Sequence, residues 1–556
     1  MRPQYWTMTG LAALALLLST SGSAAPTSFR VSFPRSVQAA PITGRLIVLT
    51  ATKGEPQPRL RIHPVKGPPI FGIDVEAVAP ETAMTIDAAS AAYPVADLSQ
   101  LPAGDYYVQA LLIRYTQVHR ADGHTIWVPI PSGQHHATVE PGNLYSAIKQ
   151  VHLDPAHGFA VELSLSEVIA PRPQETDTQW LKTVRIKSKV LSEFWGVPMY
   201  IGARVLLPRG FAEHPNSRYP GLYVFGHGTP FFFNPDPASH ATELPEARDA
   251  NLQTGYEFSQ VWRSDGFPRV VGITSIVPSP YFLESYSVNS ANNGPWGDAI
   301  TQELIPYLER KFRLIAQPYA RIVEGASTGG WEALALQLYY PDFFGGAWVF
   351  NPDPIDFHRY QLSDIYEDEN MFSIRVGPWL SAERPDRRTR EGQPLYSVRR
   401  TAQFEAVLGS KGRSNYQLDI WQATHGPVGP DGYPVPLFDK KTGVIDRDVV
   451  EYMRGHGYDL TEYTRRNWSR LGPKLAGKLN FFAGEQDDFF LNLGVYNYQE
   501  MLQEMRDPPA SARFEYGRPK KGHNWHHTHW AGVVREMTEH IKRTAPAAAD
   551  TAQWSY

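Results

Sequence analysis

The stretch Gly325-Ala326-Ser327-Thr328-Gly329-Gly330 follows the pattern G-x-S-x-G, and it decides the prediction of the fold. Residues 320–324 before it form a short β-like run, and residues 331–338 after it are helix-prone and apolar nearly all round. A strand, a tight turn and a helix are the context in which this pattern carries a nucleophilic serine. We therefore predict a nucleophile elbow at Ser327, with an ordinary glycine-rich turn as the alternative.

Composition limits the classes of protein to which this chain can belong. Its 556 residues are too many for one ordinary domain. The formal net charge is −4 and no strongly basic run occurs, so we expect no nucleic-acid partner. The chain contains no cysteine, which excludes disulfides, thiolate catalysis and cysteine-ligated metals.

Residues 1–25 have the features of a cleavable signal peptide. Arg2 precedes an apolar run at residues 11–18, and small residues occupy positions 21–25. The apolar run is too short to span a bilayer of about 30 Å, so we expect no membrane anchor. These features predict an exported protein, periplasmic or extracellular.

The remaining chain divides into two predicted domains. Residues 26–170 contain short β-branched and aromatic runs separated by breaks with proline, glycine and asparagine, which predicts an all-β, immunoglobulin-like sandwich. Residues 171–180 resemble a linker. Strands then alternate with helices over residues 181–545, with an inserted cap at about 355–475. An alanine-rich tail at 546–556 is predicted to be disordered.

The second domain is predicted to have an α/β fold with a mostly parallel sheet. Residues 183–186 and 199–207 resemble an antiparallel opening pair. Short apolar runs typical of buried parallel strands follow at 221–225, 269–273, 321–323, 347–350 and 479–482.

A serine nucleophile needs a base, and the base needs an orienting acid. The acid is expected after the strand at 479–482, where Asp487 lies three residues beyond a glycine. Asp488 is the alternative one position away, and Asp353 and Asp356 are less favoured candidates.

The base is expected after a strand at 512–516, where His523 directly follows a glycine in a loop before a helix. His425 is a rival base without such a context. His526, His527 and His529 make a metal cluster conceivable, but no acidic ligand set lies nearby and we predict no metal site.

The oxyanion hole is predicted to use the backbone N–H of Thr328. A second donor is expected from Gly228 or Thr229, in the loop after the strand at 221–225. Aromatic side chains beside the predicted site loops are candidates for binding substrate, although core packing explains most aromatic residues. They are Phe231, Trp296, Trp331 and Trp525.

Several ordered motifs together resemble the putative-esterase family, which includes enterochelin, feruloyl and acetyl-xylan esterases, S-formylglutathione hydrolase and the antigen 85 mycolyltransferases. These motifs are residues 292–296, 303–308, the elbow, 341–345 and 522–525. The resemblance covers roughly residues 181–545. It implies an α/β-hydrolase fold, a triad of Ser327, Asp487 and His523, and ester chemistry without a cofactor.

The expected activity is hydrolysis of a small-molecule or carbohydrate-linked ester through an acyl-enzyme. An acyltransferase or a serine peptidase on the same fold is an alternative, and so is a non-catalytic binding protein on a hydrolase scaffold. The sequence does not indicate the natural ester, the role of the β-domain or the oligomeric state.

Overall fold

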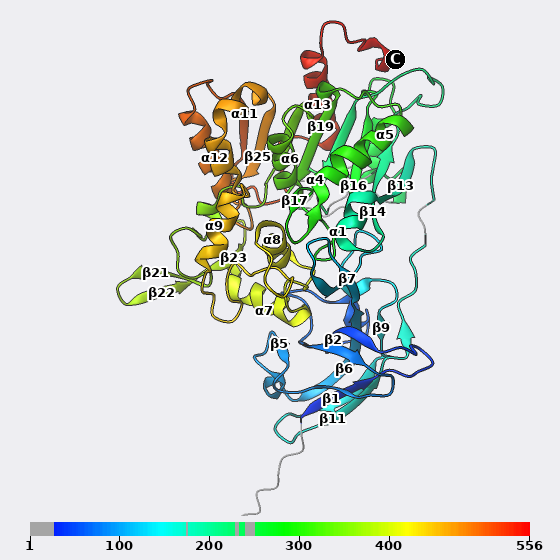
Figure 1. Ribbon diagram of the computed structural model, residues 1–556, viewed down its shortest axis with the longest axis vertical. Helices are drawn as coiled ribbons and strands as arrows, with labels where there is room; N and C mark the ends of the chain where they lie inside the picture. Colours follow the sequence, from blue (N-terminus) through cyan, green and yellow to red (C-terminus); the bar gives the residue numbers. More distant parts are fainter. Residues whose placement is uncertain (1–26, 174–175, 228–232, 239–250) are drawn as a thin grey trace, which may run out of the picture.

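The computed structural model describes residues 27–173, 176–227, 233–238 and 251–556. The predicted signal peptide lies outside these residues. Within them the chain forms an all-β domain, an α/β domain and an insertion between the two (Figure 1). None of the helices described there is long and apolar enough to cross a bilayer.

The α/β domain is built on an eight-stranded sheet with the order β13-β14-β16-β15-β19-β20-β25-β26. β14 is antiparallel to both β13 and β16, and all the other neighbours are parallel. The strand bounds are β13 Leu181–Ser188, β14 Met199–Leu206, β15 Gly221–Phe225, β16 Val271–Ile276, β19 Arg321–Ala326, β20 Gly346–Phe350, β25 Leu479–Gly484 and β26 Ala512–Gly517.

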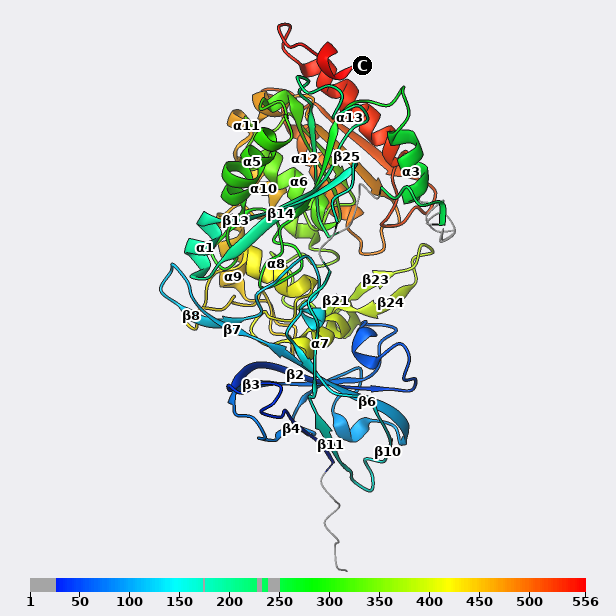
Figure 2. The same ribbon diagram turned by 90° about the vertical axis from the view of Figure 1, so that its right-hand side faces the viewer.

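Helices cover both faces of this sheet (Figure 2). α3 (Gly255–Trp262) and α13 (Trp530–Thr544) lie on one face, whereas α5 (Ile305–Lys311) and α6 (Thr328–Tyr339) lie on the other. The parallel strands and α6 are almost wholly buried, as their continuous apolar sequences require. The expected α/β-hydrolase-like fold is confirmed, with the difference that α1 (Lys189–Trp195) separates the opening antiparallel strands.

The N-terminal domain is a sandwich of two sheets that share one core. Phe29 and Val31 of β1 pack with Val48, Phe71 and Val108 of the larger sheet. The sheet orders are β11-β1-β4 and β12-β9-β6-β2-β3-β5, with β10 also on β6, and β1 is parallel to β11. Whether the sandwich is immunoglobulin-like stays a prediction. The bounds are β1 Ser28–Ser32, β2 Ile42–Ala51, β3 Ile70–Val78, β4 Met84–Ile86, β5 Ala91–Tyr93, β6 Gly104–Arg114, β9 Leu144–Tyr145, β10 Lys149–Leu153, β11 Ala160–Ser164 and β12 Glu167–Val168.

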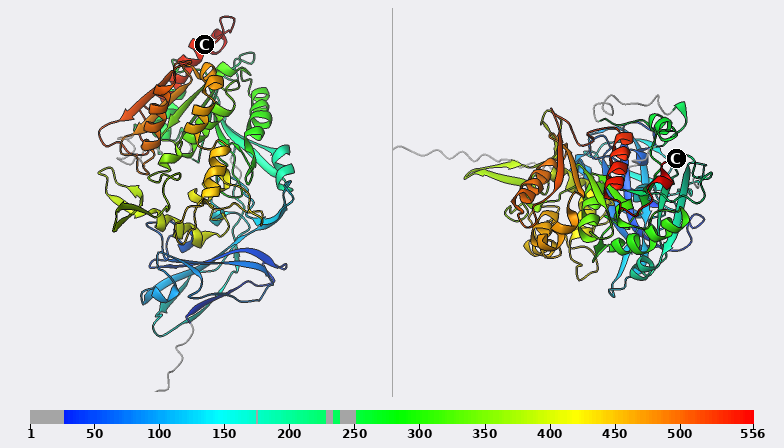
Figure 3. Two further views of the ribbon diagram at one scale, coloured as in Figure 1. Left: turned by 60° about the vertical axis from the view of Figure 1, so that its left-hand side comes forward. Right: turned by 90° about the horizontal axis from the view of Figure 1, so that it is seen from above.

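The chain between β20 and β25 forms an insertion that lies between the β-domain and the α/β sheet (Figures 1 and 3). It contains two hairpins, β21–β22 (Ser373–Gly377, Leu380–Glu383) and β23–β24 (Pro385–Arg388, Pro394–Ser397). Its helices are α7 Val398–Leu408, α8 Gln417–His425, α9 Arg447–Gly455, α10 Leu460–Arg466 and α11 Trp468–Leu475.

Helix α7 shares a hydrophobic cluster with the β-domain. Phe404 and Leu408 of α7 pack with Ile47, Leu111 and further apolar residues of the larger sheet. The buried guanidinium of Arg45 donates to the backbone carbonyls of residues 406 and 407 at 3.0 Å, near the end of α7. The β-domain and the insertion therefore pack as one body.

The C-terminal tail differs from the expected disorder. Trp554 is 1% exposed, and Tyr556 stacks on His214 with ring centroids 3.5 Å apart. The Tyr556 hydroxyl also lies 2.7 Å from that of Tyr219. The tail is ordered because two aromatic rings anchor an otherwise alanine-rich segment to the α/β domain.

Candidate active site

Ser327 occupies a sharp turn between β19 and α6. Its φ of 57° and ψ of −122° lie in a region that non-glycine residues rarely adopt. The neighbouring glycines permit this turn, since a Cβ on Gly329 would lie 2.1 Å from the carbonyl oxygen of Phe225. A Cβ on Gly325 would lie 2.2 Å from the carbonyl oxygen of Gly329. The backbone thus has the geometry of a nucleophile elbow.

Part-buried His523 and buried Asp487 form a pair in the loops that follow adjacent strands. Nδ1 of His523 lies 2.7 Å from Oδ2 of Asp487, whose side chain has no exposed surface. The other oxygen of Asp487 accepts hydrogen bonds from the backbone N–H groups of Phe489 at 2.9 Å and Leu491 at 3.1 Å. These donors fix the carboxylate, which in turn fixes the tautomer and orientation of the imidazole.

Asp488, the alternative acid, does not contact the imidazole ring of His523 through any described hydrogen bond. Its Oδ1 accepts from the backbone N–H of His523 at 3.3 Å, and its Oδ2 lies 3.5 Å from the guanidinium of Arg387. Among the described contacts, the carboxylate on the His523 ring is that of Asp487.

Charges around His523 favour its protonated form. Burial alone would lower the pKa of the imidazole, but the Asp487 carboxylate, with further contributions from Asp353 and Asp488, raises that pKa above its ordinary value. The base therefore loses its proton only at a higher pH than an isolated histidine would.

A second buried carboxylate, that of Asp353, lies against the elbow. Its Oδ1 accepts from the Ser327 hydroxyl at 3.3 Å, and its Oδ2 accepts from the Thr328 hydroxyl at 2.9 Å. Gln417 of α8 donates to the same Oδ2 at 2.8 Å, and the Tyr286 hydroxyl also donates to it. Asp353 thereby connects α8 of the insertion directly to Ser327. The sequence signal was its place just beyond the carboxyl end of β20.

The structure brings Asp487 and His523 together but does not join His523 to Ser327. Among the described residues, no hydrogen bond connects the Ser327 hydroxyl to His523, and Asp353 is its acceptor. Catalytic hydrogen bonds often form only when substrate is bound, so this geometry is compatible with a triad.

The predicted oxyanion hole is only partly within the described residues. Thr328 is the first residue of α6, where backbone N–H groups point out of the helix end. Gly228, Thr229 and Phe231 lie outside the described residues. Gly226 is described and has a φ of 104°, and a Cβ on it would lie 3.0 Å from the Gly329 nitrogen. The start of the loop after β15 therefore packs against the first turn of α6.

The other predicted aromatic residues are in the packed interior. Trp296 and Trp331 have no exposed surface; Trp296 donates to the carbonyl of Asn293 at 2.8 Å, and Trp331 packs against Tyr286. Trp525 is 9% exposed and packs over Gly517. Their contact with substrate stays a prediction.

The remaining histidines have structural surroundings. His425 packs among Trp331, Tyr286 and other rings, and burial lowers its pKa to about 3. His526 lies near the Phe350 ring, and the Nε2–H of His527 donates to the Glu536 carboxylate at 2.9 Å. Within the described part of the chain, no group of three or more histidine or acidic residues is arranged to hold a metal ion.

Residues 198–390 match the model of the family described as "Putative esterase". This segment contains the elbow and Asp353 but ends before Asp487 and His523. A comparison with curated proteins found no match. The match covers less than half of the chain and supports a hydrolase enzyme.

Solved structures with a similar fold have low sequence identity. A ferulic acid esterase is 16% identical with a TM-score of 0.35, and the match covers 66% of this chain and 98% of that one. The fluorophosphonate-binding serine hydrolase F of Staphylococcus aureus is 13% identical with a TM-score of 0.30, covering 65% and 98%. An S-formylglutathione hydrolase from Agrobacterium tumefaciens is 11% identical with a TM-score of 0.31, covering 67% and 96%. No conclusion about substrate follows from similarities at this level.

Proposed function

We propose that this chain is an exported serine esterase that hydrolyses a carboxylic ester through Ser327, His523 and Asp487. The observation that carries the proposal is the strained Ser327 elbow together with the 2.7 Å contact between His523 and buried Asp487. The signal-like residues 1–25 support export.

The proposed reaction has two steps. His523 takes the proton of Ser327 as the serine oxygen attacks the ester carbonyl, and the alcohol leaves with a proton returned by His523. Water, activated by the same imidazole, then releases the acid from the acyl-enzyme. Asp487 stabilises the imidazolium in both steps, and the backbone N–H of Thr328 stabilises the oxyanion.

The test is Ser327→Ala, assayed with 4-nitrophenyl esters and with a fluorophosphonate probe. We expect kcat to fall by roughly 10⁴–10⁶ and labelling to disappear, while the thermal unfolding profile is retained. Ser287→Ala is a matched control, since Ser287 is a buried serine that donates to Glu332 rather than facing His523.

Wild-type turnover in Ser327→Ala would exclude this serine as the nucleophile. Hydrolysis of dipeptide amides in preference to esters would instead favour a peptidase. Transfer of the acyl group to an added alcohol faster than to water would favour an acyltransferase, and absence of labelling in the wild type would favour a binding protein.

A further inference from the structure

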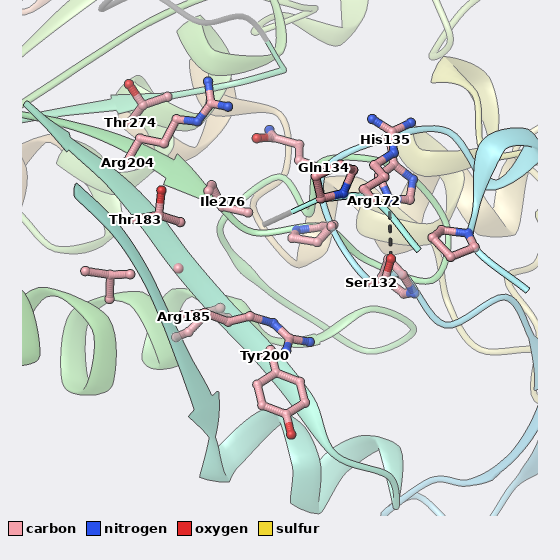
Figure 4. Close-up of a pocket in the computed structure, with 18 of the residues that line it drawn as sticks. Ser132, Gln134, His135, Arg172, Thr183, Arg185, Tyr200, Arg204, Thr274 and Ile276 are labelled. Carbon is pink, nitrogen blue, oxygen red and sulfur yellow. Dashed lines mark hydrogen bonds between the residues drawn. The ribbon is translucent and has the colours of Figure 1, made fainter. Parts of the chain in front are cut away.

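A cavity of about 940 Å³ lies between the β-domain and the α/β sheet (Figure 4). One wall is the β-domain segment 131–135, and another is the segment 171–173. The floor is the face of β13, β14 and β16 that carries Thr183, Tyr200 and Thr274. Alternate residues of β14, including Ala203 and Val205, point into the core. The cavity therefore occupies a polar sheet face that the β-domain partly covers.

Positive charge predominates in the lining. Three arginines, Arg172, Arg185 and Arg204, line the cavity against one acidic residue, Asp177. Oδ1 of Asp177 accepts from the backbone N–H of Thr183 at 2.8 Å. Arg172 and Arg185 are exposed, and the guanidinium of Arg185 lies 3.7 Å from the centroid of the Tyr200 ring. Such stacking orients a guanidinium while leaving its N–H groups able to bind an anion.

The cavity extends to the loop of the proposed oxyanion hole. His227 belongs to its lining and follows Gly226, which packs against the first turn of α6. The side-chain amide of Gln134, in the β-domain wall, donates to the carbonyl of Gly226 at 3.1 Å and to Glu284 at 2.7 Å. The β-domain thus forms the cavity wall and contacts the loop beside the elbow through one residue.

We propose that this cavity binds an anionic group, a carboxylate or a phosphate, carried by the ester substrate, with Arg172 and Arg185 as its principal ligands. This inference rests on the proposed esterase function and adds a substrate class to it. Arginine forms paired hydrogen bonds with both kinds of anion. The β-domain, through segment 131–135, would then take part directly in substrate selection.

The test compares two esters of similar length in the full chain: mono-(4-nitrophenyl) sebacate, which carries a carboxylate, and neutral 4-nitrophenyl decanoate. A long acyl chain is needed because Arg185 lies on β13, four strands and about 19 Å from β19 and Ser327. We expect the wild type to prefer the sebacate in kcat/KM, and the preference to decline with added salt because exposed charges are screened. In Arg172→Gln/Arg185→Gln the ratio should fall about tenfold or more. Arg30→Gln/Arg35→Gln, at two exposed arginines of the β-domain that do not line the cavity, is the charge-matched control.

Equal ratios in the wild type and the double variant would overturn the proposal, as would a ratio insensitive to salt. Calorimetric titration with succinate and with inorganic phosphate separates this result from failure of the esterase function. Binding of either anion that is lost in the double variant supports the site even if neither ester is hydrolysed. Absence of binding by both anions overturns it, even if the neutral ester is hydrolysed.

Discussion

The Ser327 hydroxyl has a carboxylate, rather than an imidazole, as its hydrogen-bond acceptor in this structure. In the proposed mechanism, attack on an ester requires the hydroxyl to turn from Asp353 toward His523. Asp353 also acts on the base from a distance, because its charge contributes to the raised pKa of His523. One buried carboxylate therefore influences both the nucleophile and the base of the proposed triad.

Removal of this charge should change the pH dependence of the reaction. In Asp353→Asn the protonated imidazole loses one stabilising carboxylate, so the pKa of His523 should fall. His523 is an active base only when neutral, and the acidic limb of kcat/KM should therefore move to lower pH. The measurement is the pH profile of kcat/KM with a neutral ester.

Asp356→Asn is the matched control, because Asp356 is a buried acid in the same loop whose Oδ1 accepts from the backbone N–H of His358 at 2.9 Å. Its charge is not among the main causes of the raised pKa of His523, so its profile should stay close to that of the wild type. An acidic limb that stays in place in Asp353→Asn would contradict the electrostatic role.

For single residues, the sequence predicted those site residues that lie just beyond the end of a strand. Asp487 and His523 each follow a strand and a glycine, and the structure brings them into contact, although their roles stay predictions. The central position of Asp353 could not be predicted. Its partners Tyr286 and Gln417 lie 67 and 64 residues away in the chain, and only the folding of the insertion brings α8 to the elbow.

At the scale of single elements, strand β19 contains a glutamate that is buried away from solvent. Glu324 is 1% exposed, and its Oε1 has no hydrogen-bond partner among the described residues. Burial raises the pKa of this carboxyl group to about 8. Folding therefore takes up a proton at Glu324 between about pH 4.5 and about pH 8. The favourable contribution of protonated Glu324 to the free energy of unfolding is complete below about pH 4.5. It is lost as the pH rises through about 8.

Glu324→Gln should reduce this dependence on pH. The free energy of unfolding of the wild type should fall more steeply from about pH 5 to about pH 9 than that of the variant, so that the variant gains relative stability at high pH. Urea unfolding at several pH values measures the difference. The exposed Glu193→Gln should keep the wild-type slope, and an unchanged slope in Glu324→Gln would mean that Glu324 is ionised in the folded state.

Elements with a strong local pattern were predicted well. The buried parallel strands were expected from short apolar runs, and the structure confirms them, with end-points that differ by a few residues. The structure of the C-terminal tail was not predicted from the sequence. Its order depends on the contacts of Trp554 and Tyr556 with distant surfaces rather than on local composition. Within the insertion, α8 and the two hairpins likewise have little local pattern and are fixed by tertiary packing, whereas α9 and α11 are amphipathic.

For the molecule as a whole, we expect the interface between α7 and the β-domain to stabilise the fold. Phe404 is 1% exposed and packs edge-on against Tyr93 of the β-domain, with ring centroids 5.3 Å apart. Phe404→Ala should lower the free energy of unfolding by about 3–5 kcal/mol. Intrinsic fluorescence and far-UV circular dichroism during urea denaturation provide the measurement.

Leu395→Ala is the control in the same insertion, because Leu395 is 54% exposed and its truncation should cost no more than about 0.5 kcal/mol. The two probes should give coincident transitions if the β-domain and the insertion unfold as one unit. An unchanged midpoint for Phe404→Ala would show that this interface does not stabilise the protein.

The guanidinium of Arg45, which donates to the last turn of α7 while pairing with Asp74 at 3.0 Å, has a consequence for protein engineering. The β-domain cannot be exchanged between enzymes as a self-contained cassette, because its larger sheet is completed by a helix encoded some 350 residues later. A chimera that transfers residues 27–170 alone would leave an arginine and an apolar sheet face without their partners. Recombination that preserves both the β-domain and α7 should yield folded hybrids.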